Sequence, residues 1–167
     1  MSGADAATPD ATTAGTQSAG VTPNGKLPTA IQVDETQNKV VSTLRGVGKQ
    51  IYDCGPSGTY VFREPAAGLF TSRGVPAGIH GKGPFWTNFD GSHVDGSAPV
   101  SAPATDPKSV AWLKLVATSS PKTTGAFGNL TFIQRLDTRG GVAPATCTAP
   151  STVAVDYVAN YVFWGPK

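Results

Sequence analysis

The stretch TVAVDYVANYVFW, residues 152–164, decides the fold class of this chain. Its odd-numbered positions carry valines and aromatic residues, whereas polar residues such as Asp156 and Asn160 occupy even-numbered positions. An alternation with a period of two is typical of a β-strand with one buried face. No stretch of the chain keeps the 3.6-residue periodicity of an amphipathic helix. Residues 152–164 therefore predict a long strand in an all-β protein.

Further strands are indicated upstream. Residues 49–54 (KQIYDC) and 59–63 (TYVFR) flank a Gly-Pro-Ser-Gly cluster at 55–58, and such a cluster between two β-rich runs predicts a hairpin. Residues 110–117 and 126–136 supply two more strand-like runs. Many short strands with Gly/Pro-rich loops between them predict a single all-β domain, either a β-sandwich or a β-barrel.

The composition narrows the classes of function. The 167 residues are 39% hydrophobic, which is enough for a core, and only 14% are charged. The formal net charge is +2 and no run of Lys or Arg exceeds two residues, so the basic stripe of a nucleic-acid-binding protein is missing. No apolar stretch approaches the roughly 18 residues of a membrane-spanning helix. We therefore expect no nucleic-acid partner, no membrane span and, since no cofactor motif is present, no cofactor.

The first 26 residues differ in composition from the rest. They are rich in Ala, Thr, Gly, Ser and Pro, and such a segment buries too little apolar surface to offset its ordering entropy. We predict a flexible arm at 1–26, or an arm held by a second copy of the chain as an added strand, and an all-β domain at 27–167. The second alternative would make the protein a homo-oligomer. Residues 1–20 lack the apolar core and early positive charge of a signal peptide.

Cys54 and Cys147 are the two cysteines, and they lie 93 positions apart. This separation excludes the CxxC spacing of metal and redox motifs. We predict that they form a disulfide; the alternative is two separate buried thiols. Low charge and abundant Thr, Ser and Gly suit an exported protein, and disulfides persist in oxidising compartments. We therefore expect an extracellular protein.

The candidate functional segment is GVPAGIHGKGPFWTNFDGSHVDG, residues 74–96. It contains both histidines, His80 and His93, together with Trp86 and a dense run of glycines. It is too rich in glycine for a helix and too aromatic for a spacer. We expect it to be a loop lying over the strands, because binding groups tend to lie on loops that a rigid scaffold positions.

Four residues are candidate ligand-binding residues: His80, Trp86, Asp90 and Arg135. Trp86 is suited to stack on a sugar ring or another flat apolar ligand, or else it packs in the core. Arg135 is suited to grip a carboxylate or phosphate, or else it pairs with an internal acid. His80 and Asp90 are candidates for an acid/base pair, and His80 and His93 are weak candidates for metal ligands. The alternative is that Asp90 caps its own turn and His80 is a structural donor.

Separated motifs also occur in a fixed order along the chain. They are Tyr52-Asp53-Cys54, Pro65-Ala66 before Leu69-Phe70, Gly78-x-His80-x-x-Gly83-Pro84-x-Trp86, Asp90-Gly91-Ser92, Trp112-Leu113, Ile133-Gln134-Arg135, Thr138-x-Gly140-Gly141-x-Ala143-Pro144, Cys147 and Tyr157-x-Ala159-x-Tyr161-x-Phe163. Over roughly residues 45–164 the pattern resembles the domain of unknown function 3455 family of secreted bacterial and fungal proteins. The resemblance implies export and an all-β domain and supplies no established activity. The chain departs from the pattern at Thr87, where an acidic residue often follows the tryptophan, and at Lys114, which interrupts an aliphatic run.

Three functions are compatible with these observations, and the first is favoured because the chain lacks a recognisable nucleophile, cofactor motif or metal-ligand set. It is a secreted, non-enzymatic binding or structural protein that recognises a glycan or small molecule through the segment with His80, Trp86 and Asp90. The second is a metal-dependent or hydrolytic enzyme that uses His80 and Asp90. The third is a self-assembling extracellular surface or filament subunit that uses its N-terminal arm.

Overall fold

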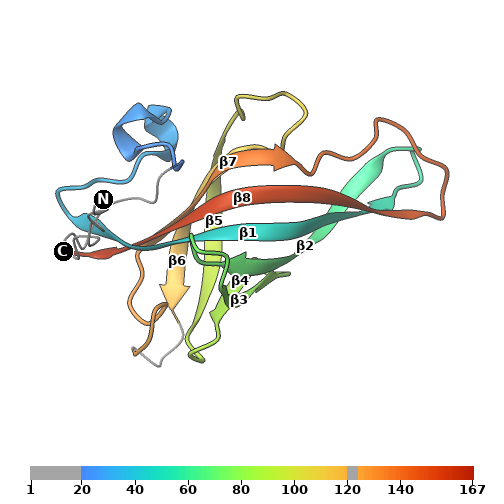
Figure 1. Ribbon diagram of the computed structural model, residues 1–167. Coiled ribbons are helices and arrows are strands. Elements are labelled where there is room, and N and C mark those ends of the chain that lie inside the picture. Colours follow the sequence, from blue (N-terminus) through green and yellow to red (C-terminus); the bar gives the residue numbers. More distant parts are fainter. Residues whose placement is uncertain (1–19, 120–123) are drawn as a thin grey trace, which may run out of the picture.

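The computed structural model describes residues 20–119 and 124–167, which form an all-β structure. Eight antiparallel strands follow one another in chain order around a closed barrel, and β1 pairs with both β2 and β8 (Figure 1). The strands are β1 (Asn38–Cys54), β2 (Tyr60–Phe70), β3 (Pro76–Gly81), β4 (Phe85–Asn88), β5 (His93–Ala102), β6 (Trp112–Ser119), β7 (Phe132–Gly140) and β8 (Thr152–Pro166). The predicted all-β class is confirmed, and of the two predicted architectures the chain adopts the barrel.

Two short 3-10 helices, η1 (Asn24–Lys26) and η2 (Thr29–Ile31), precede the first strand. Within residues 20–119 and 124–167, no helix has the length and apolar character needed to cross a membrane.

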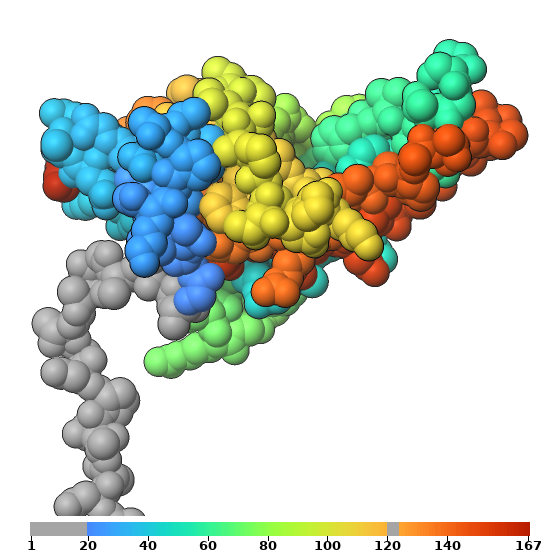
Figure 2. All heavy atoms as spheres, turned by 90° about the horizontal axis from the view of Figure 1, so that it is seen from above, coloured from blue at the N-terminus to red at the C-terminus, as the bar shows by residue number. Residues whose placement is uncertain are grey.

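The longest strands, β1 and β8, pair along almost their whole length, from Asn38 opposite Pro166 to Asp53 opposite Thr152. Together with β2 they continue beyond the other strands as a three-stranded extension, which ends at the turn after β1 (Figure 1). Figure 2 shows this extension projecting from the body of the molecule. The hairpin predicted around residues 55–58 is confirmed, because Cys54 pairs with Tyr60 across that turn.

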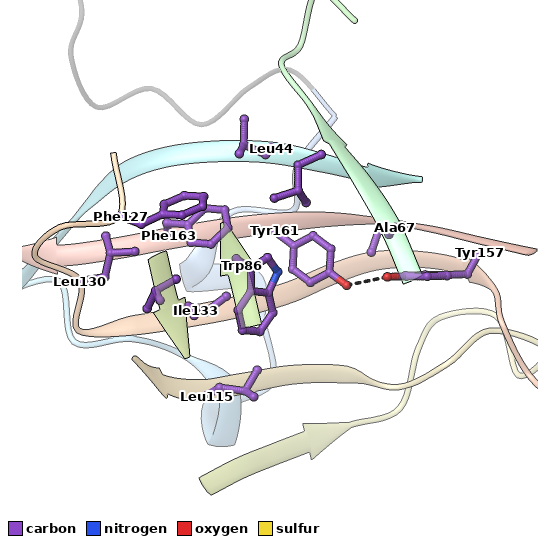
Figure 3. Close-up of a cluster of buried hydrophobic side chains, with 13 residues drawn as sticks. Leu44, Ala67, Trp86, Leu115, Phe127, Leu130, Ile133, Tyr157, Tyr161 and Phe163 are labelled. Carbon is purple, nitrogen blue, oxygen red and sulfur yellow. Dashed lines mark hydrogen bonds between the residues drawn. The ribbon is translucent and has the colours of Figure 1, made fainter. Parts of the chain in front are cut away.

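From Tyr157 to Phe163 the odd-numbered residues of β8 point into the barrel, as the alternation predicts. They join an inner core of large side chains contributed by several strands and by the segment before β7 (Figure 3). Its fully buried aromatic members are Trp86, Phe127, Tyr161 and Phe163. Phe127 is fully buried and its ring centroid lies 4.5 Å from that of Phe163.

Glycines on the strands make room for these rings. A Cβ at Gly46 of β1 would lie 2.5 Å from the ring of Tyr161, and one at Gly96 of β5 would lie 2.9 Å from the ring of Trp86. Both distances are shorter than a carbon contact of about 3.5 Å allows. The rings therefore lie against neighbouring strands at positions where those strands carry no side chain.

A second hydrophobic core lies outside the barrel. Residues 20–37 cover the outer faces of β5 to β8, where their apolar side chains pack on Trp112, Leu136 and Trp164. The apolar side chains of this covering segment are Val21, Leu27, Ile31 and Val33. Trp86 and Trp112 are both buried, the first inside the barrel and the second under this segment.

The covering segment includes the end of the arm expected at residues 1–26. Residues 1–19 of that arm lie outside the described residues. Val21 and Asn24, near its other end, are buried against the barrel. The domain boundary at residue 27 and the role of the arm in oligomer formation stay predictions.

A buried polar network fixes the covering segment on the barrel. The side chain of Asn24 accepts from the backbone nitrogen of Val33 at 2.9 Å and donates to its carbonyl oxygen at 2.8 Å. Gln134 of β7 donates through Nε2 to the carbonyl oxygen of Ile31 at 2.7 Å and to Asn24 Oδ1 at 3.2 Å. Its Oε1 accepts from the indole nitrogen of Trp164 at 2.8 Å. Because each of these polar side chains has its hydrogen-bond partners, the network defines a single position of the covering segment on the barrel.

The prediction that residues 74–96 form a loop is wrong. These residues form β3, β4 and the start of β5, so most of the glycine-rich segment belongs to the barrel wall. Gly78 shows why the composition misleads, since a Cβ there would lie 2.2 Å from the carbonyl oxygen of Thr87 on the neighbouring strand. Glycine permits this close approach of strands, so its presence here marks strand packing.

Cys54 and Cys147 form the predicted disulfide, with their Cα atoms 5.9 Å apart. The bond joins the end of β1 to the segment between β7 and β8. The same segment is tied down by a hydrogen bond of 2.9 Å from the backbone nitrogen of Cys147 to the carbonyl oxygen of Gly58. The disulfide therefore closes the tip of the three-stranded extension.

We expect Asn24→Ala to lower the free energy of unfolding by about 2–3 kcal/mol, because it leaves the buried backbone groups of Val33 without their partner and removes one hydrogen bond of Gln134. Urea denaturation followed by tryptophan fluorescence measures this loss. The control is Asn129→Ala at an exposed asparagine, which should change stability by less than about 0.5 kcal/mol. Equal stabilities of the two variants would contradict the proposed role of the network.

We expect reduction of the Cys54–Cys147 bond to lower the melting temperature by about 5–10 °C, because the bond closes a loop of 93 positions in the unfolded chain. Calorimetry of the wild type with and without reductant measures the shift. The variant Cys54→Ser/Cys147→Ser should melt at the temperature of the reduced wild type and should not respond to reductant.

Candidate functional site

The barrel opens at one end into a cavity of about 410 Å³, beside the start of the three-stranded extension. Its apolar lining residues are Phe62, Pro65, Pro84, Trp86, Pro99, Leu113 and Leu115. Its polar and charged lining residues are Gln50, Arg63, His80, Lys82, Arg135 and Tyr161. A mostly apolar cavity of a few hundred Å³ with a few polar groups is typical of a small-molecule site.

Three rings form the inner wall of the cavity. His80 of β3 and Trp86 of β4 are directly opposite each other in the sheet, and their rings stack with centroids 4.4 Å apart and planes 12° apart. The ring of Tyr161 on β8 lies 5.0 Å from that of His80. It also lies 5.6 Å from the ring of Trp86, and Figure 3 shows these two rings. Trp86 and Tyr161 also belong to the inner core. These rings therefore separate the cavity from the filled part of the barrel.

His80 is held as a neutral ring of defined tautomer. Its Nδ1 lies 2.8 Å from the carbonyl oxygen of Phe85, and because a carbonyl only accepts, Nδ1 carries the proton. Burial lowers the pKa of His80 to about 4, and the nearby positive charge of Arg135 acts in the same direction. At neutral pH the remaining nitrogen, Nε2, is therefore a hydrogen-bond acceptor.

Two residues that line the cavity each carry a buried N–H donor for which the described part of the chain offers no hydrogen-bond partner. These donors are the indole nitrogen of Trp86 and the amide nitrogen of Gln50, and each side chain belongs to a residue that is 1% exposed. A buried donor without a partner costs about 1–3 kcal/mol. An acceptor bound in the cavity would remove this cost.

Arg135 of β7 brings a positive charge to the cavity wall. Its Nε and Nη2 donate to the carbonyl oxygen of Ala111 at 3.1 and 2.7 Å. None of the acidic residues in the described ranges lies within ion-pairing distance of its guanidinium, so the alternative of an internal acid as its partner does not hold. No lining residue of the cavity is acidic. The guanidinium therefore borders the cavity without a neighbouring negative charge.

Two tyrosine hydroxyls lie beside this charge. The hydroxyls of Tyr157 and Tyr161 are 3.0 Å apart and share a hydrogen bond (Figure 3). Burial raises the pKa of each of these hydroxyls above its usual value, whereas Arg135 acts in the opposite direction. Both therefore remain protonated at neutral pH.

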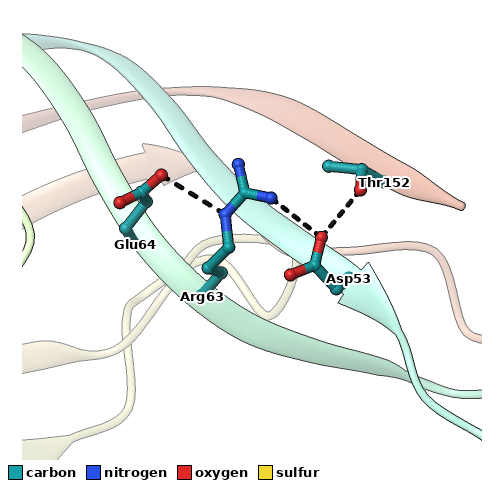
Figure 4. Close-up of polar contacts among 4 residues, drawn as sticks. All are labelled: Asp53, Arg63, Glu64 and Thr152. Atoms are coloured by element: carbon teal, nitrogen blue, oxygen red, sulfur yellow. Dashed lines mark hydrogen bonds and ion pairs between the residues drawn. The ribbon is translucent and has the colours of Figure 1, made fainter.

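The positive charge of Arg63, the second arginine at the cavity, is already paired with carboxylates. Arg63 Nη1 lies 3.0 Å from a carboxylate oxygen of Asp53, and Arg63 Nε lies 3.3 Å from Glu64 (Figure 4). Asp53 also accepts from the Thr152 hydroxyl at 2.7 Å, which ties β2 to β8 across β1. Arg63 thus contributes mainly to the rim of the cavity, together with Lys82.

Asp90 lies away from the other three candidate residues. It occupies the turn between β4 and β5, at the opposite end of β4 from the turn that lines the cavity. Its carboxylate accepts from the backbone nitrogens of Ser92 and Ala126, each at 2.8 Å. Hydrogen bonds from Ser92 lower the pKa of Asp90. Asp90 therefore caps its own turn and fixes the segment that carries Phe127 into the barrel.

The second histidine, His93, does not line the cavity, and its ring has partners of its own. His93 shares a hydrogen bond of 2.8 Å between Nδ1 and the Thr87 hydroxyl, and its Nε2 lies 3.2 Å from Asp95. In the described ranges, no three His, Cys, Asp or Glu residues come together as a possible metal site. Metal binding by His80 or His93 stays a prediction.

The cavity thus brings together His80, Trp86 and Arg135 and leaves out Asp90. Sequence analysis missed Gln50 and Tyr161 as cavity residues. The alternation of residues 152–164 places Tyr161 on the inner face of the strand, so the sequence pattern does predict that Tyr161 is buried. No sequence pattern predicts that Gln50 is buried, because only the register of β1 with β8 shows which face of β1 it occupies.

A family model described as "Protein of unknown function (DUF3455)" matches residues 35–165. The match covers all eight strands of the barrel apart from the last residue of β8. No curated protein and no solved structure matches the chain.

We expect the buried, neutral state of His80 to make stability depend on pH. The pKa of His80 is about 4 in the folded protein and about 6.5 when unfolded, so the unfolded chain binds more protons between these values. The free energy of unfolding should therefore fall by about 2 kcal/mol between pH 7 and pH 4.5 from this residue. Urea denaturation at both pH values measures the loss.

The variant His80→Gln removes this titration and should show a pH difference smaller by that amount. The matched control is His93→Gln outside the cavity, which should retain the wild-type pH difference. A wild-type pH difference in the His80 variant would show that His80 is not the group responsible.

Proposed function

The chain belongs to the DUF3455 family, whose description assigns no function, and we propose that it is an exported, non-enzymatic protein that binds a small, largely apolar molecule in its barrel-end cavity. Eight-stranded barrels are wide enough to hold one small ligand. The disulfide at the tip of the extension supports export, because such bonds persist in oxidising compartments.

The observation that carries the proposal is the pair of unpartnered donors on Trp86 and Gln50. Buried donors are almost always satisfied in folded proteins, and those that are not call for an explanation. Here both donors belong to residues that line the same apolar cavity. A ligand with an acceptor group at that point would complete their hydrogen bonds while its apolar part contacts Leu113 and Leu115.

The arrangement favours such a ligand over a sugar ring stacked on Trp86. One face of the indole is covered by His80 at 4.4 Å, and Tyr161 packs edge-on against it. Trp86 is 1% exposed, so it offers no open platform of the kind that a glycan would use.

Binding is also favoured over catalysis by His80 and Asp90. A general acid or base must lie within hydrogen-bonding reach of the group that it protonates or deprotonates. Asp90 is held in the turn at the far end of β4 by Ser92 and Ala126, so it does not share the cavity with His80. The two residues therefore lack the common site that this enzymatic alternative requires.

We expect the neutral fluorescent probe N-phenyl-1-naphthylamine to bind with a stoichiometry of one and to gain fluorescence in the cavity. The variant Leu113→Trp fills the cavity and should weaken this binding at least about tenfold, since the probe loses its apolar contacts. Fluorescence titration measures both affinities.

The matched control is Val116→Trp, which places the same side chain on the exposed outer face of the same strand. It should bind the probe like the wild type. The proposal fails if the wild type does not bind the probe, or if both variants bind it equally.

A further inference from the structure

We propose that the ligand of the cavity is a monocarboxylate with an apolar body, and that Arg135 binds its carboxylate. The inference rests on the proposed function and adds the chemical class of the ligand. It starts from the charge that Arg135 brings to the cavity wall.

A half-buried guanidinium without a neighbouring carboxylate is unusual, because buried charges in proteins are generally paired. Two acids, Asp53 and Glu64, contact the lining residue Arg63 and are engaged by that arginine. Within the described ranges, no acid pairs with Arg135. A bound anion would supply the missing charge.

The geometry of Arg135 leaves donors for this anion. A guanidinium carries five N–H groups, and in Arg135 Nε and Nη2 donate to the carbonyl oxygen of Ala111, which fixes the plane of the group. Three N–H groups remain, and the Tyr161 hydroxyl beside the guanidinium competes for one of them, so at least two are available for an anion on the same planar fork. Such a fork matches the two oxygens of a carboxylate.

The other polar groups of the cavity point to the same class of ligand. Trp86 Nε1, Gln50 Nε2 and the free N–H groups of Arg135 are donors, and they outnumber the one free acceptor described above, His80 Nε2, so the cavity has a surplus of donors. A carboxylate is purely an acceptor and offers about four lone-pair sites. It would satisfy these donors, whereas a cationic head group would add to the positive charge of Arg135.

The body of the ligand follows from the rest of the wall. Leu113, Leu115, Phe62 and Pro99 present apolar surface around the cavity, and its volume of about 410 Å³ lies in the range of small-molecule sites. Lys82 at the rim adds positive potential, which attracts an anion toward the cavity.

Three compounds that share a ten-carbon chain test the head group on the wild-type protein: decanoate, decanol and decyltrimethylammonium. Each is titrated by isothermal calorimetry at pH 7 and by displacement of N-phenyl-1-naphthylamine. We expect decanoate to bind at least about tenfold more tightly than decanol, because it gains charge-assisted hydrogen bonds, and the cation to bind most weakly. Equal or tighter binding of decanol would overturn the inference.

Arginine variants identify the residue. Arg135→Gln should abolish the preference for decanoate over decanol, and Arg135→Lys should keep the preference for an anion but bind decanoate more weakly, since it lacks the fork. The control Arg139→Gln removes an exposed positive charge from the same strand and should leave the preference unchanged. Retention of the full preference in Arg135→Gln would overturn the role of Arg135.

The outcomes separate this inference from the proposed function. Binding of the neutral probe with no preference for decanoate contradicts the carboxylate and leaves the apolar site in place. Failure of the probe to bind contradicts the proposed function itself. The head-group series uses only the wild type, so it decides the matter even where Arg135→Gln does not fold.

Discussion

The interior of this barrel depends on large rings packing against strand positions that carry no side chain. The ring of Tyr161 lies over Gly46, and that of Trp86 lies against Gly96. A methyl group at either glycine would collide with the ring, so the rings and the glycines must occur together. This pairing fills one part of the barrel tightly and leaves the adjoining part beyond Tyr161 open as the cavity.

The last strand, β8, is buried on both faces over its C-terminal half. Tyr161 and Phe163 point inward, and Trp164 points outward under the covering segment of residues 20–37. The hydrogen bonds from Trp164 to Gln134 and on to Asn24 join the barrel wall to that segment. The outer layer therefore supports the same strand that carries the rings of the cavity wall.

Residues 152–164 predicted their strand correctly because a period of two is a local property of the sequence. The disulfide of Cys54 and Cys147 was predicted from composition. The glycines of residues 74–96 predicted a loop where the chain forms strands, since the sequence alone does not distinguish a glycine that allows a turn from one that allows strands to approach closely.

The candidate site required long-range information. Closing the barrel places Arg135 of β7 near Tyr161 of β8 and opposite the His80–Trp86 pair. It places Asp90 at the other end of β4. Strand register and barrel closure decide the positions of Arg135 and Asp90, and the local spacing of residues in the sequence predicts neither position.

The pairing of β8 with β1 also bears on how the chain reaches this structure. Asn38 and Pro166 are neighbours in the sheet although more than a hundred residues separate them, and the same holds for Leu44 and Tyr161. Contacts between such distant segments form slowly, because a long loop must close before they stabilise anything. The ring of strands stays open until residues 152–166 are available, so a ribosome or a translocation pore that still holds these residues would keep the whole barrel unfinished.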